Sequence, residues 1–129
     1  MGWVGRYKRA LADASVWLER QLPEIASGNR ERLAAAFVEL NVMEWHVKRS
    51  LARRKIAPPG PESSVDKLLA TRVEQGLYRT LLEVWETSGL VDASLFGSYM
   101  HSRAQSIYGG TQQIQRNIVA QRVLRMPRS

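Results

Sequence analysis

The sequence contains no cysteine and only two histidines, and these shortages remove several classes of site. Without cysteine there can be no disulfide, no thiolate nucleophile and no zinc–thiolate site. Neither His46 nor His101 has a second histidine at ligand spacing, so the sequence predicts no metal site. Because a chain without cysteine fits a reducing compartment, we expect a cytoplasmic protein.

Long apolar runs are missing as well. The longest uncharged apolar run, residues 33–38, is far shorter than the roughly 20 residues of a membrane-spanning helix. Basic residues at positions 6, 8 and 9 are followed by no sustained apolar stretch, so we expect neither a membrane span nor a secretory signal. A chain of 129 residues, 44% hydrophobic and 24% charged, has the composition of ordinary globular proteins. Its length predicts one domain, over residues 1–129.

The formal net charge of +7 raises the question of nucleic-acid binding. Basic residues are spread over the chain among acidic ones, and the densest cluster, residues 48–55, falls at a predicted helix end, where cations suit the helix dipole. Net positive charge without a nucleic-acid-binding motif usually reflects charged residues on a solvent-exposed face. We therefore predict no nucleic-acid partner. The alternative, a basic helical nucleic-acid binder, predicts an affinity that falls steeply with salt.

Apolar residues recur at helical spacing along the chain, and no alternating strand pattern is present. The first helix is predicted from the stripe that runs from Tyr7 to Leu22. Pro23 is expected to kink or end it, and Ser27-Gly28-Asn29 to form a break. Asn29 is then the predicted N-cap of a second helix over residues 30–54.

The second predicted helix carries two apolar lines, which implies contact with more than one neighbour. The lines contain Leu33, Phe37, Leu40, Val47 and Leu51, and Val38, Val42 and Trp45. Glu44 falls on the first line, where a paired carboxylate at the edge of the core is favoured over a functional one.

The remaining breaks divide the rest of the chain into three helices. Residues 56–61 are a proline-rich connection, and Ser63 with Asp66 resembles a capping box at the start of the third helix. We expect Ser88-Gly89 to close that helix, and a fourth helix to follow until Gly109-Gly110. Thr111 opens a final helix with Ile114, Ile118 and Val123 inward, and Pro127 stops it. The predicted fold class is all-α, an antiparallel helix bundle.

The glycine pair ahead of the final helix is the strongest candidate site. Glycines allow a close approach of the backbone to a ligand, and the N–H groups that start a helix attract anions such as a pyrophosphate. Thr111 and Gln113 add side-chain donors in the first turn. The alternative, favoured by the physics of the sequence alone, is a simple corner with Thr111 as its N-cap.

Residues 108–124 read YGGTQQIQRNIVAQRVL and closely resemble the closing signature of acyl-CoA dehydrogenases, a Gly-Thr turn followed by Ile-Gln-Arg and a helix. Residues 64–69 resemble the start of that family's long middle helix more weakly. The resemblance implies the carboxy-terminal helical domain of a flavoenzyme that oxidises the α,β bond of an acyl-CoA. It also implies that FAD lies between domains and reaches across a subunit interface, with Gly110, Thr111 and Gln113 beside it.

The family resemblance also implies partners. Members are commonly dimers or tetramers built through this domain, so we expect a homo-oligomer or association with a dehydrogenase partner chain. The acyl-CoA would be bound by the complete enzyme, whose amino-terminal helical and middle β domains this sequence lacks.

The sequence departs from the family pattern in two places, one residue and one short segment. Gly109 stands where many members carry the glutamate base, and glycine cannot take a proton, so no catalytic residue is nominated. Residues 83–89 replace a glycine-rich cofactor motif, and Glu83 and Glu86 would repel a pyrophosphate. These departures motivate the alternative of a non-catalytic subunit or interaction module.

Overall fold

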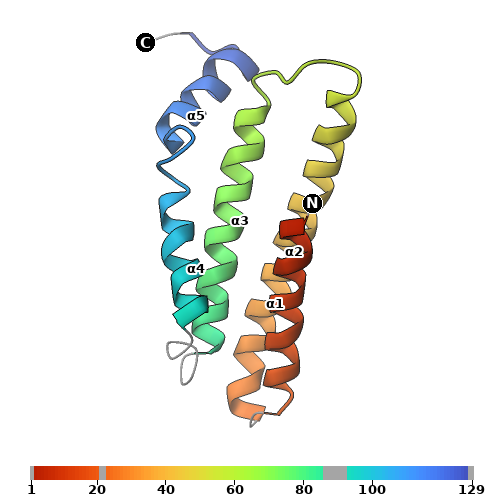
Figure 1. Cartoon of the computed structure of the whole chain (residues 1–129), viewed down its shortest axis with the longest axis vertical. Coiled ribbons are helices and arrows are strands. Elements are labelled where there is room, and N and C mark those ends of the chain that lie inside the picture. The colour runs from red at the N-terminus through yellow and green to blue at the C-terminus, as the bar shows by residue number, and fades with distance from the viewer. Residues whose placement is uncertain (1, 21–22, 86–92, 128–129) are drawn as a thin grey trace.

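A computed structural model describes residues 2–20, 23–85 and 93–127, whose regular elements are helices with no strand among them (Figure 1). The helices are α1 (Gly2–Leu18), α2 (Pro23–Arg54), α3 (Ser63–Val84), α4 (Ala93–Ala104) and α5 (Gln112–Ile118), and a π-helical turn, η2 (Val119–Val123), continues α5. This confirms the predicted all-α class. In the part of the chain so described, no helix is long and apolar enough to cross a membrane.

Helix α3 lies at the centre of the bundle and contacts all four other α-helices. Figure 1 shows α1 and α2 on one side of α3 and the shorter α4 and α5 in succession on the other, with neighbours running in opposite directions. The antiparallel bundle is therefore confirmed. The α4–α5 turn lies beside the amino-terminal part of α3, where Lys67 contacts it.

The core is one cluster of apolar side chains from α1, α2 and α3. Its buried members are Val4, Tyr7, Leu11, Ala14, Leu18, Leu33, Leu40, Met43, Val73, Leu77, Leu81 and Val84. Burying a side chain of this size contributes roughly 1.5–3 kcal/mol. At its edge the Trp17 ring stacks on that of Trp85, with centroids 5.0 Å apart. The stripe predicted for the first helix is thus largely confirmed, and Val73, Leu77, Leu81 and Val84 form the buried stripe of α3.

The predicted break at Ser27-Gly28-Asn29 was wrong. Helix α2 begins at Pro23 and runs without interruption to Arg54, so Asn29 lies inside it rather than at its N-cap. Proline suits the first turn of a helix because its missing N–H has no partner there in any case. One glycine inside a helix costs only about 1 kcal/mol, which the packing of α2 against α1 offsets.

The predicted capping box at the start of α3 was also wrong. The N-cap is Glu62, with no side-chain capping bond, and the Ser63 hydroxyl donates to the carbonyl oxygen of Gly60 at 2.9 Å. Asp66 instead binds α2. At the other end, α3 stops at Val84 with Trp85 as its C-cap. The predicted stop at Ser88-Gly89 lies outside the described residues.

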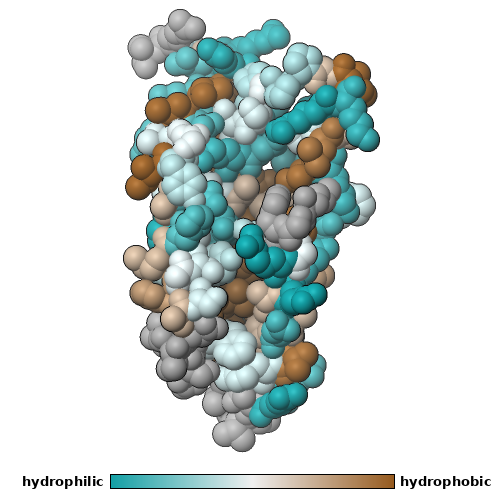
Figure 2. Space-filling model, in the orientation of Figure 1, coloured by the Kyte–Doolittle hydropathy of each residue, from teal (hydrophilic) through white to brown (hydrophobic). Residues whose placement is uncertain are grey.

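Several apolar residues are exposed, among them Ile114, which was predicted to face inward. On α2, the exposed residues include the second apolar line of Val38, Val42 and Trp45, for which the sequence predicted contact with a further neighbour, and Trp45 is 68% accessible. On α4 and α5, the buried positions are the polar Ser102 and Gln115, whereas Ile114 is exposed. Hydrophobic side chains consequently appear on the surface over α5 in Figure 2. Helices α4 and α5 meet only one face of the bundle, so their other sides have nothing to pack against.

Candidate functional site

The predicted site is the turn that joins α4 to α5. Gly109 has φ +69° and Gly110 has φ +96°, a backbone region that side chains rarely adopt. The two glycines are therefore required by the shape of this turn. They let the chain turn between Tyr108 and Thr111 and enter α5 directly.

Lys67 of α3 holds the turn from the inside. Its Nζ donates to the carbonyl oxygen of Tyr108 at 2.5 Å and to that of Gln105 at 3.3 Å. The ammonium also lies 5.8 Å from the centre of the Tyr108 ring. A Cβ added at Gly109 would lie 3.0 Å from the same Nζ, so a side chain at this position would crowd the lysine.

Thr111 is the N-cap of α5, as predicted. Its extended backbone (φ −60°, ψ 158°) lets Oγ1 accept a hydrogen bond from the Ile114 N–H at 3.4 Å. Two further N–H groups of the first turn are bonded within the chain, that of Gln112 to the Ser106 oxygen and that of Gln115 to the Thr111 oxygen. The sequence suggested that these N–H groups face a ligand, but most of them are already used. The helix end alone therefore gives little support to an anion site.

Gln115 of α5 also stabilises the turn. Its side chain is only 9% exposed, and Nε2 donates to the Gly109 oxygen at 3.2 Å. A Cβ added at Gly110 would lie 2.5 Å from this nitrogen. No role was predicted from the sequence for Gln115 or Lys67. The sequence does place a polar residue, Gln115, next to the apolar Ile114. Only the orientation of α5 on α3 shows that Gln115 is the buried one of the two.

The predicted cofactor residues lie together on the outer side of this turn. Gly110 and Thr111 are half-buried, and Gln113 is exposed. They line neither of the two grooves, of about 740 and 720 Å³, that flank α3. One groove lies between α1 and α4 and the other between α2 and α5. The three residues form an open surface that another domain or chain could cover.

The carboxylates near these grooves have partners within the bundle. The Tyr7 hydroxyl is hydrogen-bonded to Glu74, and burial together with that bond raises its pKa well above the ordinary value. Across the other groove, Arg72 lies 3.0 Å from Glu39. Glu83, which replaces a residue of the glycine-rich family motif, lies 3.9 Å from Arg32. Residues 86–89 of that motif region are outside the described part of the chain.

Glu44 is a paired carboxylate, as the sequence analysis favoured. It accepts from Lys8 of α1 at 2.5 Å and lies 2.9 Å from Lys48, four residues further along α2. The hydrogen bonds from Lys8 and Lys48 lower the pKa of its carboxyl. Among the described residues, no group of three or more histidine and carboxylate side chains is arranged to hold a metal ion.

Comparison with known proteins gives the same family from most of the chain. Residues 1–124 match the family model described as "Acyl-CoA dehydrogenase, C-terminal domain". Acyl-CoA dehydrogenase FadE34 of Mycobacterium tuberculosis is 30% identical over 118 residues, which cover 92% of this chain and 13% of that protein. Acyl-CoA dehydrogenase IpdE1 is 36% identical in Mycolicibacterium smegmatis and 34% in M. tuberculosis, each over 104 residues and 77% of this chain.

The chain spans between 13% and 27% of the length of these three relatives. The similarity therefore concerns one part of each relative. No solved structure matches the chain.

Proposed function

Because the chain belongs to the acyl-CoA dehydrogenase family, as a C-terminal helical domain, we propose that it works as that part of an FAD-dependent enzyme. The reaction would be the α,β-dehydrogenation of an acyl-CoA thioester. The observation that carries the proposal is the Gly109–Gly110–Thr111 turn, whose shape is fixed by α3 and by Gln115. The amino-terminal helical and β domains would come from the same polypeptide or from another chain. Residues 1–129 would form one domain, in a cytoplasmic enzyme.

The outer surface of the turn fits one wall of a flavin site. The Thr111 hydroxyl accepts from the Ile114 N–H, so its own hydrogen remains available to a ligand oxygen. Gln113 presents an exposed amide two residues further on, and the half-buried Gly110 immediately precedes the threonine. These three residues would hold the cofactor. When bound, FAD would accept the hydride from the acyl β-carbon.

Gly109 cannot serve as the base of this reaction. It has no side chain, and its φ of +69° and the nearby Lys67 ammonium both disfavour a larger residue. The α-proton would therefore be taken by a group elsewhere in the assembled enzyme or in a partner subunit. This chain would contribute the cofactor wall and the oligomer core.

The exposed apolar residues support self-association or docking with a dehydrogenase chain. Two surfaces are available, the line of Val38, Val42 and Trp45 on α2 and the outer side of α4 and α5. Apolar surface of this extent on separate faces commonly marks contacts between subunits or domains.

The test of the cofactor surface is the FAD affinity of the chain assembled with its companion domains. Gln113→Ala removes an exposed donor without touching the packed turn, and we expect it to weaken FAD binding roughly tenfold, the value of a hydrogen bond to a charged group. Gln121→Ala, an exposed glutamine of η2, is the matched control and should leave the affinity unchanged. Equal affinities for all three proteins would overturn the assignment of this surface.

The alternative is a subunit that keeps the bundle but has no chemistry of its own, and the absence of a carboxylate at Gly109 favours it. In that case the chain would bind a complete dehydrogenase, and flavin content would follow that partner alone. Dehydrogenase activity that falls with Gln113→Ala in this chain, at unchanged partner binding, would exclude the alternative.

A further inference from the structure

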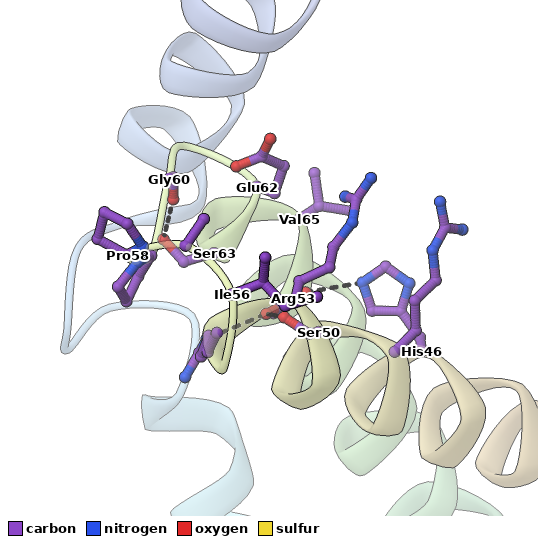
Figure 3. A pocket seen from close by; sticks show the side chains of 14 residues that line it. His46, Ser50, Arg53, Ile56, Pro58, Gly60, Glu62, Ser63 and Val65 are labelled. Carbon is purple, nitrogen blue, oxygen red and sulfur yellow. Dashed lines mark hydrogen bonds and ion pairs between the residues drawn. The ribbon is translucent and has the colours of Figure 1, made fainter.

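A cleft of about 430 Å³ lies at the end of the bundle where the chain passes from α2 to α3, and no role has been assigned to it above (Figure 3). One wall is the last turns of α2, another is the loop of residues 56–60, and the floor is the first turn of α3. None of the lining residues belongs to the α4–α5 turn. Its volume lies within the range of small-molecule sites.

The α2 wall is cationic. Arg49, Arg53 and Arg54 all line the cleft, and the first two are four residues apart on one face of the helix. Arg54 is paired with Asp66 at 3.2 Å. Arg49 and Arg53 are exposed, and within the described residues neither has an ion pair. Two guanidinium groups therefore remain available to a ligand at the cleft.

The acidic residues of the cleft do not cancel this charge. The Asp66 carboxylate is already shared by three neighbours, with His46 Nε2 at 2.7 Å, Ser50 Oγ at 2.5 Å and Arg54 at 3.2 Å. Dashed lines in Figure 3 mark bonds of this network on the floor of the cleft. The one other carboxylate among the lining residues is Glu62, which lies beside Gly60 in the loop.

The loop wall is apolar and stiff. It presents Ile56, which is 90% exposed, together with Ala57, Pro58 and Pro59. Consecutive prolines restrict the backbone, so the wall is largely formed before a ligand arrives. The Ser63–Gly60 hydrogen bond closes the loop onto α3. An exposed isoleucine beside two prolines offers a surface on which a flat or apolar group can lie.

We propose that this cleft binds a small soluble molecule that carries a phosphate or pyrophosphate and a flat apolar group, as a nucleotide does. Arginine is suited to phosphate because its planar fork donates two parallel hydrogen bonds to the anion. Arg49 and Arg53 bind the phosphate oxygens, and the loop wall receives the apolar part. The proposal does not depend on the flavin surface, with which the cleft shares no residue.

The experiment is a titration of the 129-residue chain with ADP, followed by calorimetry and by backbone amide NMR at about physiological salt, where diffuse charge attraction is screened. We expect one saturable site, with the largest shifts in residues 46–66. Adenosine, which lacks the phosphates, should bind at least about tenfold more weakly, because the arginines provide most of the affinity.

The variants Arg49→Gln and Arg53→Gln should each weaken ADP binding about tenfold or more. Arg9→Gln on α1 removes the same charge from an exposed arginine that does not line the cleft, and it should change the affinity less than about twofold. Equal losses in all three variants would show a general effect of net charge and overturn the proposal. So would the absence of saturable ADP binding, or binding confined to vesicles of anionic lipid.

Discussion

At the scale of single residues, the α4–α5 turn depends on contacts that tie a flexible pair of glycines to a fixed shape. Lys67 donates to the carbonyl oxygen of Tyr108, and Gln115 donates to that of Gly109. Both glycines have positive φ. The stability of the turn therefore depends on the side chains of Lys67 and Gln115 and on the backbone conformations of the two glycines. Each contribution can be tested by a separate substitution.

Gly110→Ala should destabilise the protein by about 1–3 kcal/mol, the usual cost of a side chain in a disfavoured backbone region. The new Cβ would also displace the Gln115 amide, which lies 2.5 Å away, from the Gly109 oxygen. Urea unfolding measures the change. The control is Gly97→Ala in α4, where a Cβ meets nothing within 4 Å and should stabilise the helix by up to about 1 kcal/mol. Similar effects of the two substitutions would contradict the structure of the turn.

Glu44 should give the stability of the bundle a specific dependence on pH. Its hydrogen bonds from Lys8 and Lys48 lower the pKa of the carboxyl below the ordinary 4.5. A lowered pKa in the folded state means that the contribution is present above pH 4.5 and is lost as the pH falls through the folded-state pKa. Glu44→Gln should therefore be less stable than the wild type at neutral pH, and the gap should close on acidification. A gap that is independent of pH would refute the pairing.

At the scale of elements, the end of α2 and the start of α3 are joined by one carboxylate. Asp66→Ala would remove the shared acceptor of His46, Ser50 and Arg54, and we expect a loss of about 2 kcal/mol or more. Hydrogen exchange should speed up most in residues 46–66. Asp13→Ala, at an exposed position of α1, is the control and should change little. Uniform exchange rates in both variants would mean that the network does not stabilise this junction.

The pattern of the sequence was enough to predict the number and kind of elements, because apolar stripes such as those of α1 and α3 face one core. It failed where one local signal competed with another. Pro23 begins a helix rather than ending one, and Gly28 is tolerated inside it. Asp66 could cap α3, but three donors from α2 satisfy it instead. The buried faces of α4 and α5 are set by how both helices pack on α3. The spacing of apolar residues in the sequence carries no information about that packing.

For the candidate site, the same limit applies. The glycine pair and the Thr111 cap were predicted from local chemistry, and the structure confirms the cap. The role of Lys67 was not predicted. Its Nζ lies 2.5 Å from the carbonyl oxygen of Tyr108, a residue about 40 positions further along the sequence. A contact of that kind follows from the packing of α3 against the turn, so local pattern could not reveal it.

At the scale of the whole molecule, the exposed apolar line on α2 predicts association. Val42 and Trp45 are 56% and 68% exposed, one turn apart on the same face. The double variant Val42→Arg with Trp45→Arg should lower the mass of the chain in solution, measured by light scattering, toward that of a monomer. Val16→Arg, an exposed valine of α1, is the control. The proposal that two copies of the chain associate through this face would be contradicted if the wild-type chain is already monomeric. It would also be contradicted if the double variant keeps the wild-type mass.

The visible absorption spectrum would show whether the chain works as part of a flavoenzyme. The purified chain is mixed with FAD, alone and then with its amino-terminal helical and β domains, and the free flavin is removed. We predict a protein-bound flavin band in the assembled protein that bleaches when acyl-CoA is added, and a weaker band or none with the chain alone. A well-folded assembly that retains no flavin would contradict the account and leave the chain as a scaffold.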